Sequence, residues 1–209
     1  MTAPRNTWRY TMTVEVTTPE GVRSGYAVRQ VTYHSPGYGF LGESQPHWDL
    51  KGQAVVVDLP NGRSLYALLR SAGNLGVSYG ARIADSALGE GGRVRGWQGR
   101  VELYPNPPKT RILSYVDPLP MLVTFGNPAD SKSVQLVEAH DAAATLGPGY
   151  ALKRIDIEIV DEGVTTGIEQ RLPWLSRVVE RRLDPAFVMS SHPNLAETLS
   201  HGDFLQGYR

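Results

Sequence analysis

The sequence predicts a mainly β protein: an antiparallel β-sandwich or a strongly curved sheet, with one or two flanking helices. Polar and apolar residues alternate with period two in several stretches, which is typical of half-buried strands. The 209 residues include 22 Gly and 15 Pro, a level that favours many turns between short strands. Apolar residues make up 41% of the chain, enough for a sizeable core, and one domain over residues 1–209 is the simplest organisation.

A hairpin near the middle of the chain is the clearest local prediction. Two apolar runs, residues 54–59 and 65–69, flank the turn at residues 60–63. Asn61 and Gly62 tolerate the positive φ that a tight reversal requires. The first run is apolar on both faces, which predicts a central strand covered on both sides. The second run also fits one buried helical turn, and the strand is favoured.

A first hairpin is predicted before it. Residues 8–16 alternate cleanly, and residues 22–33 return after a loop that contains Pro19 and Gly21. In the return strand Tyr26 is out of phase with Val31. A β-bulge near residues 29–30 would restore the alternation.

The rest of the chain predicts shorter elements. Residues 101–104, 121–125, 133–137 and 151–160 read as strands, the last with strict alternation. Residues 81–88 and 141–146 read as short helices. Residues 173–183 are the strongest helix prediction, because Pro173 suits the first turn and an apolar stripe follows. Residues 184–209 are predicted to be a loosely packed tail.

Composition excludes several classes of function. Lys and Arg total 21 and so do Asp and Glu, so the chain has no basic excess for a phosphate backbone, and no nucleic-acid partner is expected. The absence of cysteine excludes disulfides and thiolate catalysis. No segment has the length and apolar character of a transmembrane span, and the start does not resemble a secretion signal. We expect a cytoplasmic protein, or a periplasmic or cell-envelope protein if a leader is removed.

The loop at residues 34–48 is the candidate binding surface. It is rich in Gly, Pro and Ser and carries aromatic residues, which make adaptable contacts on Gly-flanked loops. Tyr38, Phe40 and Trp48 are the candidate binding residues. The alternative is an ordinary surface loop whose aromatic side chains fold back on the sheet.

Catalytic patterns are weak. Residues 76–80 match the G-x-S-x-G pattern of a serine hydrolase, with Ser78 at its centre. That chemistry requires a strand directly before the serine, and residues 70–74 do not form one. Asp156 and Glu158 share a strand face, as paired carboxylates of a glycosidase would. A charge-balanced outer face explains them more simply, because Arg154 lies beside them.

The histidines do not show the close spacing of a zinc hydrolase. They are His34, His47, His140, His192 and His201. Residues 138–141 bring together possible donors, but Asp141 is better explained as a helix cap. We therefore predict no metal site, no cofactor and no catalytic residue.

Four stretches of the chain resemble a family of uncharacterised bacterial proteins, found mostly in proteobacteria. They are TVEVTTPEGVRSGYAV, GQAVVVDLPNGRSLYALL, LVTFGNPADSKSV and LGPGYALKRIDIEIVDEGVTTGIEQRLPWL. Such relatives often carry an export or lipoprotein leader. The resemblance implies that these blocks are structural, and it implies no functional residue because the family has no established activity.

Two functions follow as hypotheses. The first is a non-enzymatic binding or structural module, located in the cell envelope if a leader is removed, with an unidentified protein or small ligand as partner. It is motivated by a well-specified β scaffold with Gly-rich aromatic loops. The second is a hydrolase that uses Ser78 or a His-centred site.

Overall fold

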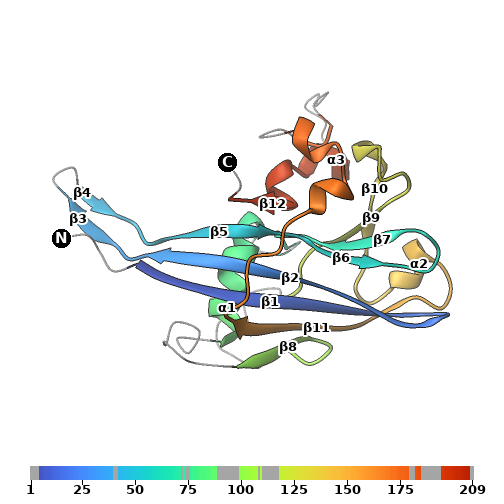
Figure 1. The fold of residues 1–209 in the computed structure, drawn as a ribbon, viewed down its shortest axis with the longest axis horizontal. Helices are drawn as coiled ribbons and strands as arrows, with labels where there is room; N and C mark the ends of the chain where they lie inside the picture. Colours follow the sequence, from blue (N-terminus) through green and yellow to red (C-terminus); the bar gives the residue numbers. More distant parts are fainter. Residues whose placement is uncertain are drawn as a thin grey trace.

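The computed structural model places the chain in two antiparallel sheets with short helices around them (Figure 1), and the prediction of a mainly β, sandwich-like fold is confirmed. The structure describes residues 5–39, 42–71, 73, 76–88, 99–107, 109, 118–178, 182–184 and 194–207.

The larger sheet has six strands in the order β12-β5-β2-β1-β11-β8. Their bounds are β1 (Arg5–Thr18), β2 (Gly21–His34), β5 (His47–Gln53), β8 (Arg100–Tyr104), β11 (Ala151–Val160) and β12 (Leu205–Gln206). The long β1–β2 hairpin and strand β11 confirm the alternation read from the sequence. Side chains at even positions of β1, from Trp8 to Val16, are buried.

The smaller sheet has the order β10-β9-β7-β6. Its strands are β6 (Val55–Asp58), β7 (Ser64–Ala67), β9 (Leu122–Phe125) and β10 (Val134–Val137). The predicted central hairpin is confirmed as β6–β7, and Gly62 in its turn has φ +78°. A third, two-stranded sheet, β3 (Gly37–Gly39) with β4 (Gly42–Ser44), extends β2 and β5 away from the body (Figure 1).

The helices are short. The α-helices are α1 (Tyr79–Leu88), α2 (Ala142–Leu146) and α3 (Leu195–Thr198). The 3₁₀ turns are η1 (Gly76–Ser78), η3 (Ser131–Ser133), η4 (Ile168–Gln170), η5 (Leu175–Arg177) and η6 (His201–Asp203). The predicted helices at residues 81–88 and 141–146 are confirmed as α1 and α2. Among the described residues, no helix combines the length and the apolar character that crossing a membrane requires.

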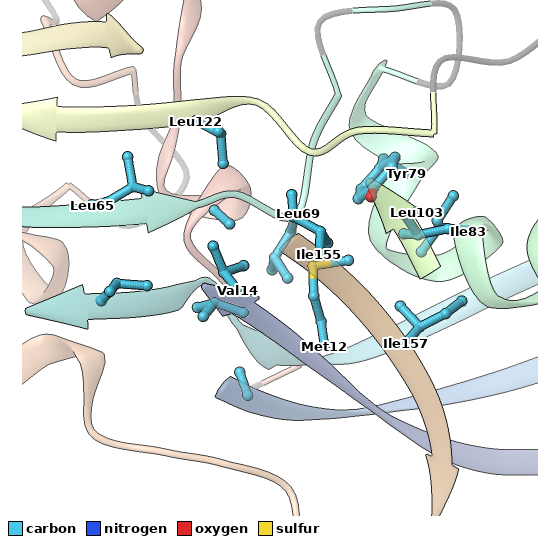
Figure 2. Close-up of a cluster of buried hydrophobic side chains, with 14 of the residues drawn as sticks. Met12, Val14, Leu65, Leu69, Tyr79, Ile83, Leu103, Leu122, Ile155 and Ile157 are labelled. Carbon is cyan, nitrogen blue, oxygen red and sulfur yellow. The ribbon is translucent and has the colours of Figure 1, made fainter. Parts of the chain in front are cut away.

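The first hydrophobic core lies between the six-stranded sheet and the hairpin β6–β7, with α1 beside it. Figure 2 shows side chains of β1 and β11 pointing toward those of β7, β9 and α1. Its labelled members are Met12, Val14, Leu65, Leu69, Tyr79, Ile83, Leu103, Leu122, Ile155 and Ile157.

A second core lies on the other face of the four-stranded sheet. Tyr66, Phe125, Trp174 and Phe204 form an aromatic cluster there, with ring centroids 5.5–6.4 Å apart in the contacting pairs. The four-stranded sheet is therefore a middle layer. One face packs on the larger sheet, and the other packs on the C-terminal segments.

Strand β6 is an edge strand, so the prediction of a central strand is wrong. Its two faces are nevertheless covered, because Val55 and Val57 belong to the first core and Val56 packs against the second. Strand β2 crosses close to this edge at Gly25, where an added Cβ would lie only 1.9 Å from the Val56 carbonyl oxygen. The apolar run therefore reflects the burial of both faces of β6, which does not require a neighbouring strand on each side.

No bulge interrupts the β1–β2 ladder, so that prediction is also wrong. Arg29 occupies the core face of β2 and is fully buried. Its guanidinium donates to the carbonyl oxygens of Gln53, at 3.1 Å, and Ala67, at 3.3 Å. It also lies 3.5 Å from the Tyr10 hydroxyl. Charged side chains usually lie on the outer face of a sheet. Placing Arg29 there made the alternation of β2 look interrupted, although the strand is regular.

The helix predicted at residues 173–183 is absent over the described residues 173–178, which form a turn and the short η5. There the apolar residues serve the second core from irregular backbone: Leu175 is buried and the Trp174 indole donates to the Pro128 carbonyl oxygen at 3.1 Å. The prediction of a loosely packed tail is wrong for residues 194–207. Leu199 and Phe204 have no exposed surface, because they complete the same core.

Candidate functional site

The candidate site lies on the outer face of β2 and β5, the face directed away from the first core. Side chains of adjacent antiparallel strands that stand opposite each other share a face. The ladder pairs His34 with His47 and Thr32 with Asp49. On the same strands Val31 pairs with Leu50 and points into the core. The register therefore gathers polar side chains on the outer face.

Three of these side chains form a compact cluster. His34 Nε2 lies 2.8 Å from Asp49 Oδ2. The rings of His34 and His47 stack with centroids 4.3 Å apart and planes inclined by 8°. One ligand atom from each of the three residues can be chosen so that all lie within 4.8 Å of one another. The His34 side chain is 23% exposed and that of Asp49 is 67% exposed, so solutes have access to the cluster.

A groove of about 540 Å³ adjoins the cluster. Its lining comes from β2, β5 and the end of β12: Gln30, Thr32, Trp48, Asp49, Leu50, Lys51, Gln206 and Gly207. Amide, hydroxyl, carboxylate and ammonium groups all line it, so a ligand could meet both donors and acceptors. Asp49 belongs to both the groove and the cluster.

A strap formed by residues 161–167 crosses the same face of the sheet (Figure 1). Thr165 is tied to β2 at Val28 by two hydrogen bonds, from Thr165 N–H to the Val28 carbonyl at 3.1 Å and from Val28 N–H to Thr165 Oγ1 at 2.8 Å. Arg9 donates to the carbonyls of Asp161 and Glu162, both at 3.2 Å. These bonds hold the strap beside the groove-lining part of β2.

Of the three predicted binding residues, Trp48 is the one whose side chain the structure describes. Its indole N–H donates to Asp85 of α1 at 3.1 Å, and the Arg82 guanidinium lies 5.2 Å from the ring. Tyr33 packs beside it with centroids 5.1 Å apart. Trp48 therefore anchors α1 to β5 from the core face of the sheet, although the residue is also part of the groove lining. This position agrees with the alternative of an aromatic side chain that folds back on the sheet.

The other two predicted residues lie at the projecting tip. Tyr38 belongs to β3 and pairs with Glu43 in the backbone ladder. Phe40 lies outside the described residues. Their role in binding stays a prediction.

The G-x-S-x-G segment does not form a strand–serine–helix turn. Ser78 is the last residue of η1, and α1 begins at Tyr79. The Ser78 side chain is exposed, and within the described ranges no hydrogen bond joins it to a histidine. The residues next to it serve packing instead: the Tyr10 hydroxyl donates to the Gly80 carbonyl, and Tyr79 is buried.

The carboxylates of β11 belong to an ionic network on the outer face. Asp156 is buried and accepts from Arg100 at 2.6 Å and from Arg154 at 2.9 Å. Arg154 also lies 3.5 Å from Glu102. The hydrogen bond with Asp156 raises the pKa of Arg100. This arrangement fits the predicted charge-balanced outer face.

The remaining described histidines are separate from the site. His140 packs its ring against Tyr104 at 5.5 Å. His201 belongs to η6, where burial lowers its pKa against the opposing effect of Glu169. His192 lies outside the described residues.

The chain matches no protein-family model, and comparison with curated proteins and with solved structures finds no significant match. The functional argument therefore depends on the geometry of the site.

Proposed function

We propose that the protein is a binding module that holds a small polar ligand in the groove between β2, β5 and the end of β12. The observation that carries the proposal is the groove lining itself. Hydrogen-bonding groups of different kinds converge there on strands fixed by the core, which is the arrangement that specific recognition of a polar ligand requires. The resemblance to a family of uncharacterised bacterial proteins, whose members often carry an export or lipoprotein leader, supports a place in the cell envelope as part of the same proposal.

The rigidity of the groove supports binding with little reorganisation. Gln30 and Thr32 lie on β2, which is paired on both sides, with β1 and with β5. Thr32 Oγ1 is 3.1 Å from Thr7 Oγ1, and the Gln30 side chain accepts from Arg9 at 3.1 Å. Groups that are held before the ligand arrives lose less conformational entropy on binding.

Ligand-observed saturation-transfer NMR tests the proposal. Monosaccharides and free amino acids serve as probes, because both carry several hydrogen-bonding groups. The variant Thr32→Arg places a long cationic side chain in the groove and should reduce the affinity of any probe that binds there at least tenfold. Thr17→Arg, an exposed position at the far end of β1, is the matched control.

Two results would contradict the proposal. One is that every probe that binds does so equally well to the wild type and to Thr32→Arg. The other is labelling of Ser78 by a fluorophosphonate probe, together with turnover of an ester that Ser78→Ala abolishes. That result would favour the alternative of a serine hydrolase.

A further inference from the structure

We infer that His34, His47 and Asp49 bind one divalent transition-metal ion, for which Zn²⁺ is the natural probe. Imidazole nitrogen and carboxylate oxygen are preferred ligands of Zn²⁺, and protein sites with three such ligands leave a fourth position for water or substrate. Imidazole suits Zn²⁺, Cu²⁺ and Ni²⁺, whereas Mg²⁺ and Ca²⁺ favour sites made of oxygen alone.

The backbone already places the three ligands together. His34 of β2 stands directly opposite His47 of β5, and Asp49 lies two residues further along β5 on the same face. This spacing follows from strand register and does not depend on a flexible loop. The ligands thus come from two strands bonded to each other, one of which is also paired with β1.

The distances require only side-chain adjustment. In a tetrahedral zinc site with bonds of about 2.0–2.1 Å, neighbouring ligand atoms are about 3.3 Å apart. The three ligand atoms are already within 4.8 Å of one another, and the 2.8 Å contact between His34 and Asp49 is shorter than the final spacing. His47 and Asp49 are exposed, so their side chains can rotate without disturbing the core.

The ion would lie at one end of the groove, because Asp49 belongs to both. Water at its open coordination position would face solvent and could exchange for a ligand group. The inference goes beyond the proposed function and does not depend on it, since metal binding requires no groove ligand.

Isothermal titration of the tag-free protein with Zn²⁺ provides the test. We expect one ion per chain in the wild type, and at least tenfold weaker binding in His34→Ala, His47→Ala and Asp49→Asn. His140→Ala is the matched control, because His140 is an exposed histidine outside the cluster. The affinity of this variant for Zn²⁺ should equal that of the wild type. Replacing Zn²⁺ by Mg²⁺ should give no binding.

Thermal melting gives a second measurement that also reports whether each variant folds. A free Zn²⁺ concentration of about 100 times the dissociation constant should raise the wild-type Tm by roughly 5–10 °C. The variant His34→Ala should melt cooperatively without this rise. Absence of zinc binding by the wild type, or equal binding by His34→Ala, would overturn the inference.

A groove variant away from the cluster separates the two proposals. Gln206→Arg should lose probe binding and keep one-to-one zinc binding, because Gln206 lines the groove from β12 and pairs with Gly52, which is not a metal ligand. If zinc binding is absent while monosaccharides or amino acids still bind in the groove, the metal site is refuted alone. If zinc binds and Thr32→Arg has no effect on any probe, the groove proposal is refuted alone.

Discussion

Replacing Gly25 by alanine tests how the two sheets meet. The new Cβ would lie 1.9 Å from the Val56 carbonyl oxygen, 2.8 Å from its carbonyl carbon and 3.2 Å from Val57 Cγ2. Two of these three atoms belong to backbone, which cannot rotate away as the end of a side chain can. Val56 is also held in its ladder by Tyr66, so β6 as a whole would have to move.

The magnitude follows from that displacement. Restoring a carbon–oxygen separation of about 3.2 Å requires the backbones to move apart by more than 1 Å at this point, and a gap of 0.5–1 Å already removes about a quarter to a half of each dispersion contact. Overpacking a core costs about 1–3 kcal/mol, and more where relaxation is blocked. We expect a loss of about 3–5 kcal/mol in the free energy of unfolding, and a Tm lowered by at least about 6 °C.

Urea denaturation and thermal melting by circular dichroism measure this loss. Gly163→Ala is the control, because no atom lies within 4 Å of a Cβ built there and its φ is not in the positive range. The free energy of unfolding of the control should lie within about 1 kcal/mol of the wild-type value. A slight increase is consistent with the prediction, since alanine restricts the unfolded chain. If the free energy of unfolding of Gly25→Ala lies within about 0.5 kcal/mol of the wild-type value, β2 and β6 do not meet as described.

Three further predictions concern single side chains. Arg29→Ala should lower the free energy of unfolding by at least about 3 kcal/mol in urea denaturation. Arg29→Met should lower it by less, because Met refills the space without burying a charge. Equal losses in the two variants would contradict this prediction. Trp48→Ala should cost about 2 kcal/mol by the same measurement, since it removes a partly buried ring and the partner of Asp85; a neutral effect would mean that Trp48 does not anchor α1. The folded state keeps the pKa of His201 below its usual 6.5, so the unfolded chain binds more protons as the pH falls through that value, and the free energy of unfolding decreases. The urea midpoint should therefore fall between about pH 7.5 and 5.5, and it should fall less in His201→Asn than in the wild type.

The sequence predicted those parts of the fold that local patterns determine. Alternation in residues 8–16 and 151–160 and the Asn-Gly turn at residues 61–62 led directly to β1, β11 and the β6–β7 hairpin. Each depends on neighbouring residues only, and the structure bears each of them out. The predicted helices at residues 81–88 and 141–146 have the same local origin.

The parts that failed depend on tertiary packing. Arg29 breaks the alternation of β2 because its partners, Gln53 and Ala67, are brought to it by other strands. The apolar residues Leu175, Val178 and Leu183 would share one face of a helix, but they serve equally well as contacts of the second core from irregular backbone. Period alone does not distinguish these two uses of the same residues.

The candidate site was hidden for a similar reason. His34 and His47 are thirteen positions apart, a spacing that matches none of the compact zinc motifs considered. They meet because β2 and β5 pair across the projecting β3–β4 hairpin. The separation in sequence reflects the length of that hairpin, so only the register of the pairing could have revealed the cluster.

The middle position of the four-stranded sheet has a consequence for how this chain is made. Strands β6, β7 and β9 are translated well before the Phe204 ring that seals their second face. During synthesis one face of Tyr66 and Phe125 stays exposed to water until the segment that contains Phe204 has left the ribosome. A nascent chain halted before residue 194 should therefore be cut by protease in this sheet, and resistance at that stage would show that closure does not require residues 194–207.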